Sequence, residues 1–314
     1  MGKLNMTMIG MSGCGKTCYL YGTYADMLDG ISGFNFFPSD YDQGLDLQNG
    51  WDSILEGVWP MGTAGGAVIE YQFDISLDGE DIGQFCWLDY RGGLLNDRIA
   101  ADSDDDVKKF HNRCSETDSF LVAIPADTLL KAKENDRKAN SMLMRYQTLL
   151  HHFKNINDLP VSFVITKGDL VTDKDDMQKC ISVLKTKFNP LFASHKSLMI
   201  CKVSLGKFLG EMVQGGSVEG AIQPRHLHLP ILFAFWCEFA REAQAFRDIA
   251  SGREKLGFIR GWFDDWFGAG VDPKLCREKA EEKQQLADTI WSEFVRNVDI
   301  YRKGKCILNA SGCQ

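Results

Sequence analysis

The sequence predicts an α/β fold in three layers, with a central sheet between two layers of helices. One observation is a short apolar run at residues 3–9, followed by a glycine-rich loop and an amphipathic segment at residues 18–28. A second observation is a series of apolar runs, β-branched or aromatic in character, that are typical of buried strands. These runs cover residues 84–89, 120–125, 161–165 and 198–203. A chain of 314 residues, 44% of them hydrophobic, is long enough for such a core and an addition to it.

The glycine-rich loop has the form G-x-x-x-x-G-K-[ST]. Glycines let consecutive backbone N–H groups turn onto phosphate oxygens, and the helix that follows adds its positive N-terminal end. We expect Lys16 to reach the β- and γ-phosphates of a nucleotide and the Thr17 hydroxyl to bind Mg²⁺. A chance glycine turn is the alternative, and the strand and helix in register disfavour it. The residues expected to line the phosphate site are Gly10, Ser12, Gly13, Cys14, Gly15, Lys16, Thr17 and Cys18.

A second short motif follows the apolar run at residues 84–89, where Asp89 is followed three residues later by Gly92. An aspartate at a strand end can hold Mg²⁺ through water, and the Gly92 N–H can approach a γ-phosphate because no side chain blocks it. Aspartate and glycine are also common turn residues. This D-x-x-G element is therefore read either as part of a nucleotide site or as an ordinary turn.

The base of the nucleotide is indicated by the sequence T-K-G-D, which closes the run at residues 161–165. The Asp169 carboxylate can accept hydrogen bonds from N1–H and the N2 amino group of guanine, and adenine offers neither donor on that edge. The stem of Lys167 can lie across the base plane. The run at residues 198–203 ends in Ser204 and Leu205, which we expect to form a small loop over the base.

The order and spacing of these motifs resemble the Ras-like GTPases of the translation-factor-related class of P-loop proteins, over about residues 3–210. The motifs W-P-x-G-T and D-Y-x-G-G resemble those of bacterial members of this class, including the double-GTPase type encoded with defence systems. The resemblance implies a three-layer P-loop domain with a mostly parallel six-stranded sheet and one antiparallel edge strand. It matches Thr166, Lys167 and Asp169 to the N/T-K-x-D motif, and Ser204 and Leu205 to the base loop.

The resemblance also implies two switch segments. Thr63 lies shortly before the strand predicted at residues 68–75, where the family has the first-switch threonine that binds Mg²⁺ and the γ-phosphate. Gly93 stands where a water-orienting glutamine is common, so either hydrolysis is slow, or another group of this chain supplies the function, or a partner does. Arg91 is either an arginine that acts on the γ-phosphate or an exposed switch residue, and the ordinary exposure of arginine favours the second.

The roles that follow from the motifs and from the resemblance form two sets. The catalytic set is Lys16, Thr63, Arg91 and Gly92. The metal-binding set is Thr17, Thr63 and Asp89.

The chain is expected to divide into a GTPase domain over residues 1–250 and a helical C-terminal extension over residues 251–314. The pair Asp78-Gly79 predicts a tight turn between antiparallel strands at the sheet edge. Beyond residue 250 lies an aromatic stretch with Trp262, Phe263, Trp266 and Phe267, and then a mixed-charge helix at about residues 272–301. The aromatic stretch either packs back on the nucleotide domain or forms a partner-docking surface.

Composition limits which partners and which cellular compartment we expect for this chain. The net charge of −8, from 43 acidic and 35 basic residues, argues against nucleic acid as the main partner. The ten cysteines show no C-x-x-C pair or zinc spacing, and no signal peptide or membrane-length apolar run is found. We therefore expect a cytoplasmic chain with free thiols that binds GTP, GDP and Mg²⁺ and acts as a slowly hydrolysing switch. The alternatives are a non-hydrolysing GTP-binding module and an ATP-dependent P-loop enzyme.

Overall fold

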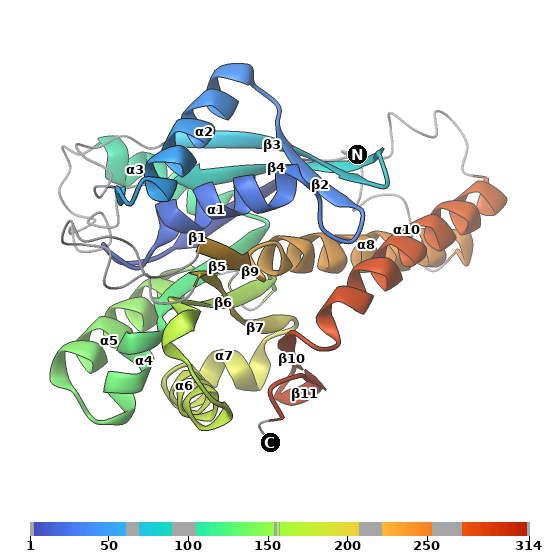
Figure 1. Ribbon diagram of the computed structural model, residues 1–314. Helices are drawn as coiled ribbons and strands as arrows, with labels where there is room; N and C mark the ends of the chain where they lie inside the picture. The colour runs from blue at the N-terminus through green and yellow to red at the C-terminus, as the bar shows by residue number, and fades with distance from the viewer. Residues whose placement is uncertain are drawn as a thin grey trace.

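The computed structural model shows a nine-stranded sheet between two layers of helices (Figure 1). It describes residues 3–60, 69–89, 105–153, 156, 158–206, 222–252 and 272–312. The strand order is β11-β10-β7-β6-β5-β1-β4-β3-β2. The five parallel strands at its centre are β1 (Lys3–Ile9), β4 (Glu80–Asp89), β5 (Ser119–Pro125), β6 (Val161–Thr166) and β7 (Leu198–Lys202). The antiparallel strands at the two edges are β2 (Phe34–Pro38), β3 (Ile69–Leu77), β10 (Val298–Arg302) and β11 (Lys305–Asn309).

The two faces of the sheet bury separate hydrophobic cores, because successive side chains of a strand point to opposite faces. On β1, Met6 and Met8 enter one core and Ile9 enters the other. The first core is covered by α1 (Lys16–Leu28), α8 (Leu229–Ala250) and α10 (Pro273–Phe294). The second is covered by α3 (Asp105–Ser115), α4 (Ala126–Lys133), α5 (Arg137–His152), α6 (Lys174–Lys187) and α7 (Asn189–Ser194). The three-layer α/β prediction is confirmed.

The prediction of six strands with one antiparallel edge strand is wrong. The expected hairpin is present, since β3 and β4 pair antiparallel around Asp78 (φ 51°) and Gly79 (φ 83°), both in the left-handed region that such two-residue turns require. The sheet does not end there, because β2 pairs with the free side of β3. Phe34 and Phe36 of β2 are buried in the first core, and this inward pair explains why so short a segment joins the sheet.

Residues 41–55 form the helix α2 (Tyr41–Leu55), which was not predicted from the sequence. Asp40 caps its N-terminus by accepting a hydrogen bond from the Gln43 N–H at 2.9 Å. The helix packs against α1, and Figure 1 shows α2 at the top of the molecule with α1 below it. Only Leu47 and Ile54 of this helix are buried, so most of its surface faces outward.

The C-terminal part is not purely helical. The mixed-charge helix is present as α10, but it ends at Phe294 rather than near residue 301, and two strands follow it. Strand β10 pairs antiparallel with β7, with Ile300 opposite Met199. Alternating β-branched residues such as Val298 and Ile300 fit a pleated, buried surface better than a helix. The proposed boundary at residue 250 coincides with the end of α8, and the division into two domains stays a prediction.

The helix α8 buries most of its largely apolar first half in the first core. It runs beside α10, and an ion pair between Lys283 Nζ and Glu242 Oε2 at 3.0 Å links the two (Figure 1). None of the helices in the described ranges combines the length and the apolar character needed to cross a membrane. In the same ranges, nine cysteines are present as free thiols.

Candidate functional site

The glycine-rich loop connects the carboxyl end of β1 to the start of α1, so the predicted strand–loop–helix arrangement is present. Gly13 (φ 74°) and Gly15 (φ 90°) adopt left-handed conformations that other residues avoid. A Cβ at Gly10 would lie 2.4 Å from Cys14 Sγ, so this position also requires glycine. Gly15 is the N-cap of α1 and makes no side-chain cap, and the first N–H groups of a helix are a ready site for an anion.

Lys16 lies folded over the loop rather than extended into solvent. Its side chain is 7% exposed, and Nζ donates to the Gly10 carbonyl at 2.8 Å and to the Met11 carbonyl at 3.5 Å. These contacts hold an ammonium group beside the backbone N–H groups that would bind phosphate. A fixed positive charge next to an N–H cradle is suited to a polyphosphate.

Thr166 joins the two predicted nucleotide-binding motifs. Its Oγ1 donates a 2.7 Å hydrogen bond to the Cys14 carbonyl in the glycine-rich loop, and the residue is 4% exposed. The first residue of T-K-G-D therefore uses its hydroxyl to hold the phosphate loop. This contact seats the loop at residues 166–169 directly against the loop at residues 10–17.

Tyr146, on α5, also binds the phosphate loop. Its hydroxyl accepts a hydrogen bond from the Met11 N–H at 2.9 Å and donates one to the Ala123 carbonyl at 2.7 Å. The residue is fully buried, and burial raises the pKa of its phenol well above the usual value, with the Cys14 thiol as the second cause. The hydroxyl thus stays protonated and bridges the loop to β5. The sequence reasoning missed this residue, because its spacing with Leu143 and Leu150 is that of an ordinary core position.

Cys14 in the loop and Cys18 in α1 are packing residues rather than reactive thiols. Burial raises the pKa of Cys14, and burial together with the neighbouring Cys14 raises the pKa of Cys18 to about 11. A thiol with a raised pKa stays neutral and unreactive near pH 7.

The T-K-G-D loop leaves the end of β6 and turns through a short 3₁₀ helix, η2 (Gly168–Leu170). Lys167 is exposed and left-handed (φ 52°), while Asp169 is half-buried. Desolvation is the main cause that raises the pKa of the Asp169 carboxyl. The Gly168 N–H donates to the Val203 carbonyl at 2.9 Å, and a Cβ at Gly168 would lie 2.7 Å from that oxygen. The loop is thus pressed against the end of β7.

The predicted base-covering loop is a strand. Ser204 and Leu205 belong to β8 (Ser204–Gly206), which pairs antiparallel with β9 (Ile222–Arg225) in a separate two-stranded sheet. Strand β8 contacts η2, so Ser204 lies beside the T-K-G-D loop as expected. The Leu205 side chain packs against α1 instead, because a Cβ added at Gly22 would lie 2.3 Å from Leu205 Cδ2.

Two of the three oxygen donors predicted for a metal, Asp89 and Thr17, lie at the same edge of the sheet. Asp89, 4% exposed, ends β4, and β4 is the parallel neighbour of β1, whose end opens into the loop carrying Thr17. Burial raises the pKa of Tyr21 on α1, and the charge of Asp89 adds to this, so the carboxylate lies near that helix. Hydroxyl and carboxylate oxygens are the ligands that Mg²⁺ prefers. No group of three His, Cys, Asp or Glu side chains converges in the described part of the chain.

Several predicted residues lie outside the described residues. These are the first-switch Thr63, the second-switch Arg91 and Gly92, Gly93, and the aromatic stretch at Trp262, Phe263, Trp266 and Phe267. The structure therefore brings together the phosphate loop, Asp89 and the T-K-G-D loop. The assignment of both switches stays a prediction.

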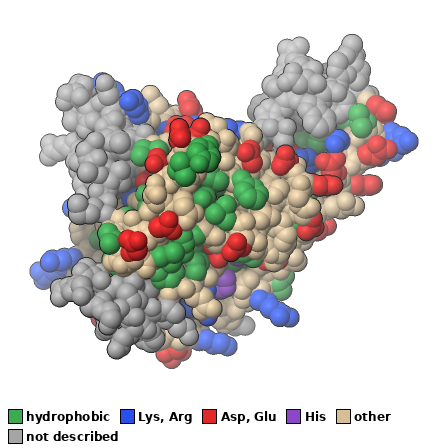
Figure 2. Space-filling view, turned by 45° about the horizontal axis from the view of Figure 1, so that its top comes forward, with side chains coloured by type: hydrophobic (Ala, Val, Ile, Leu, Met, Phe, Trp, Pro, Cys, Tyr) green, Lys and Arg blue, Asp and Glu red, His purple; other side chains and the backbone are tan. Residues whose placement is uncertain are grey.

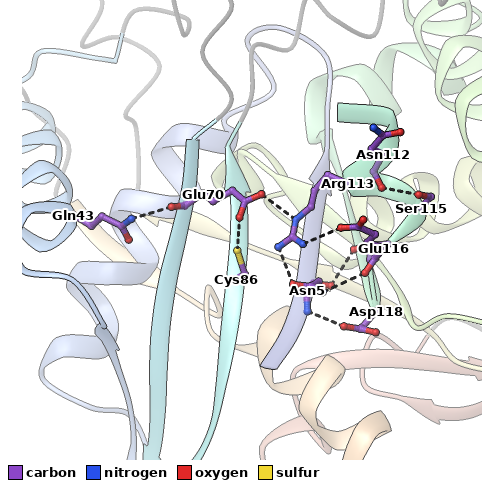
Figure 3. Close-up of polar contacts among 10 residues, drawn as sticks. Asn5, Gln43, Glu70, Cys86, Asn112, Arg113, Ser115, Glu116 and Asp118 are labelled. Carbon is purple, nitrogen blue, oxygen red and sulfur yellow. Dashed lines mark hydrogen bonds and ion pairs between the residues drawn. The ribbon is translucent and has the colours of Figure 1, made fainter. Parts of the chain in front are cut away.

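The chain after the second predicted switch is anchored by Arg113 of α3 (Figure 3). Its guanidinium donates to Asn5 Oδ1 on β1 at 2.7 Å, and its Nε lies 3.4 Å from Glu70 Oε1 on β3. Glu70 also accepts a 3.5 Å hydrogen bond from the Cys86 thiol on β4. Glu70 is the second residue of β3, the strand that follows Thr63, so Arg113 links the start of this strand to α3. Sequence spacing carried no signal for this contact.

The chain matches no protein-family model and no curated protein. Among solved structures it is similar to Sup35 complexed with GDP, at 14% identity and a TM-score of 0.32, over 65% of this chain and 38% of that one. It is also similar to the signal recognition particle receptor SRb-GTP/SRX complex from Chaetomium thermophilum, at 14% identity and a TM-score of 0.33, over 69% and 94% of the two chains. The chain thus spans well under half the length of the Sup35 chain. Scores this low carry no argument about function, which rests on the chain's own residues.

Proposed function

We propose that this chain binds GTP and GDP with Mg²⁺ between its phosphate loop and its T-K-G-D loop, and that it acts as a slowly hydrolysing nucleotide switch of the Ras-like P-loop type. The observation that carries the proposal is the buried 2.7 Å hydrogen bond from Thr166 to the Cys14 carbonyl. It places a loop suited to phosphate next to a loop suited to a purine base. One nucleotide can then contact both.

Guanine is favoured over adenine by the chemistry of Asp169. The half-buried carboxylate can accept two hydrogen bonds from guanine, and adenine would leave it unpaired in a desolvated position. The exposed Lys167 stem is available to cover the base plane. The alternative, an ATP-dependent P-loop enzyme, would use Lys16 and Thr17 but leaves Asp169 without a purpose.

Hydrolysis would proceed by in-line attack of water on the γ-phosphate. Lys16 and the N–H groups of the loop would stabilise the charge on the transferring group, because they are preorganised in a partly water-excluded site. Bound Mg²⁺ would supply further charge neutralisation, and Thr17, Thr63 and Asp89 are the residues proposed to hold it. Gly93 has no side chain to orient the water, which motivates both the slow rate and the alternative of a non-hydrolysing GTP-binding module.

The proposed setting rests on the resemblance, whereas the proposed location and partners rest on the residues. We propose a cytoplasmic location, supported by nine free cysteine thiols in the described ranges, since such thiols are typical of reducing compartments. A bacterial defence or signalling system is the proposed setting. Partners are expected to read the switch segments near Thr63 and Gly92 or the aromatic stretch around Trp262.

Competition and turnover measurements test this proposal. A fluorescent GDP analogue bound in Mg²⁺ should be displaced by GTP and GDP at far lower concentrations than by ATP, and chelating Mg²⁺ with EDTA should weaken triphosphate binding. Single-turnover hydrolysis should be on the order of 10⁻³ s⁻¹ or slower. Equal displacement by ATP contradicts the guanine assignment. Tight GTP binding with no turnover selects the non-hydrolysing module, and fast turnover means that another group, with Arg91 first, completes the site.

A further inference from the structure

Charge is distributed very unevenly along this chain. Residues 17–90 contain 13 Asp and Glu residues and no Lys, Arg or His. All 35 Lys and Arg residues lie in the rest of the chain, together with 30 of the 43 acidic ones. The net charge of −8 therefore comes from one continuous segment, which forms α1, β2, α2, β3 and β4 at one side of the sheet.

The outer surface of α2 exposes large apolar side chains, whereas the solvent face of a surface helix is normally polar. Tyr41 is 78% exposed and Leu45 is 44% exposed, and their spacing of four residues places them on the same side of the helix. Leu55 at the helix end and Val58 just beyond it are 52% and 59% exposed. In the described chain, six of the eleven exposed large hydrophobic side chains come from residues 37–69, so these positions are concentrated rather than scattered.

Carboxylates lie among these apolar side chains. Asp42 and Asp46 follow Tyr41 and Leu45 directly on the same helix, and both are exposed. Figure 2 looks down on this side of the molecule and shows hydrophobic and acidic side chains gathered in the middle, with Lys and Arg toward the rim. Within the described ranges, the carboxylates of α2 form no ion pair, whereas Glu70 on β3 pairs with Arg113. The negative charge on α2 is therefore not neutralised by the described parts of this chain.

The helix is held rigidly, so its outer face is a preformed surface. The Gln43 side chain donates to the Glu70 carbonyl and accepts from the Gln72 N–H, both at 3.0 Å, which closes the backbone edge of β3 where β2 has ended. A Cβ at Gly50 would lie 2.4 Å from the Tyr21 ring, which shows how closely α2 packs on α1. A rigid face costs little ordering entropy on binding.

We propose that the outer face of α2, made of Tyr41, Asp42, Leu45 and Asp46, docks a protein segment in which Lys or Arg alternates with apolar side chains. The apolar residues supply area to bury, and the carboxylates select the sign of the partner's charge. Nucleic acids and anionic membranes carry the same sign as this face and are repelled by it. The proposal does not depend on the nucleotide assigned to the loops.

A synthetic amphipathic peptide of lysine and leucine, labelled with fluorescein, tests this surface by fluorescence anisotropy on the full chain. We expect saturable binding that weakens with added salt. The double variant Tyr41→Ser/Leu45→Ser should weaken binding at least tenfold, and Asp42→Asn/Asp46→Asn should weaken it and flatten the salt dependence. The control Met144→Ser removes a 62% exposed side chain from α5 and should leave the affinity unchanged.

Two further peptides separate the contributions, and the thermal unfolding midpoint of each variant confirms that it is folded. A lysine–serine peptide and a glutamate–leucine peptide should both bind at least tenfold more weakly than the lysine–leucine peptide. Equal binding of either one overturns the proposal, since charge alone or apolar area alone would then suffice. Unchanged affinity in both double variants places the binding elsewhere and also overturns it, as does tight binding of RNA or anionic vesicles that the Tyr41→Ser/Leu45→Ser variant abolishes.

Discussion

The phosphate loop and the T-K-G-D loop lie side by side but are built differently. The phosphate loop is held by buried side chains from distant parts of the chain, with Tyr146 bound to Met11 and Thr166 bound to Cys14. The T-K-G-D loop is held by its backbone, through Gly168 against Val203, and the side chains expected to read the base stay exposed or half-buried.

This difference matches the demands of the two parts of a nucleotide. A phosphate group is recognised by many N–H groups at once, so the loop must hold its shape before the ligand arrives. A base is recognised by one or two side chains at its edge, so it is enough to fix where the backbone delivers them. Variants of the two loops should therefore fail in different ways, with loss of all nucleotides for one and altered choice of base for the other.

The largest effect is expected from Lys16→Ala. Removing the buried ammonium group that we propose to contact the phosphates should cost on the order of a few kcal/mol of triphosphate binding, and at least tenfold in affinity for every base. Calorimetry with GTP measures the loss, and Lys16→Met separates charge from the aliphatic stem. The exposed Lys138→Ala on α5 serves as the matched control. Unchanged affinity in Lys16→Ala would refute the assignment of the phosphate loop.

A change of base preference is expected from Asp169→Asn. Losing the charged carboxylate, which can accept two hydrogen bonds, should weaken GTP binding by about 2 kcal/mol. The amide donor should favour xanthine nucleotides, whose position 2 carries a carbonyl. Competition of GTP and XTP against the fluorescent GDP analogue measures the exchange. Asp175→Asn on α6 controls for loss of a nearby exposed charge. If the variant bound GTP and XTP more weakly by the same factor, Asp169 would support the loop and would not recognise the base.

A smaller, uniform effect is expected from Tyr146→Phe. It leaves the Met11 N–H without its buried acceptor. This should weaken the binding of every nucleotide by about 1 kcal/mol, or roughly fivefold in affinity. Tyr24→Phe, a buried tyrosine of α1 away from the loop, is the matched control, and Thr166→Val tests the second contact. The diphosphate-to-triphosphate ratio and the base preference should stay constant. A change in base preference would show that the two loops are not independent.

The smallest effect is expected from Asp26→Asn on α1, which touches neither loop. Desolvation raises the pKa of Asp26 to about 6, so between about pH 4 and pH 6 the folded state holds a proton that the unfolded chain releases. Stability of the natural chain should fall as pH rises through this window. The neutral amide should therefore raise the free energy of unfolding by about 1 kcal/mol at pH 7, a figure already reduced for solvent screening. The gain near pH 5 should be smaller. Urea unfolding at both pH values measures this, and a gain that does not depend on pH would contradict it.

The fold could be predicted where one stretch of chain contains its own signal. The glycine loop after β1, the Asp78-Gly79 hairpin and the buried runs of β5 and β6 were predicted from local patterns and are present. The missed elements include β2, α2, β10 and β11. Strand β2 is short, and β10 continues directly after a helical pattern, so each becomes a strand only because an existing strand offers it a partner edge.

What the sequence by itself determined is the set of chemical groups in the candidate site. A glycine loop with lysine and threonine, an aspartate at a strand end, and T-K-G-D all follow from local backbone and side-chain chemistry. Only the tertiary structure decided how these groups are held. Tyr146 reaches Met11 across 135 residues, Thr166 reaches Cys14 across 152, and Arg113 reaches Asn5 across 108. Such contacts depend on which helix covers which face of the sheet, and long-range packing of this kind leaves no periodic trace in the sequence.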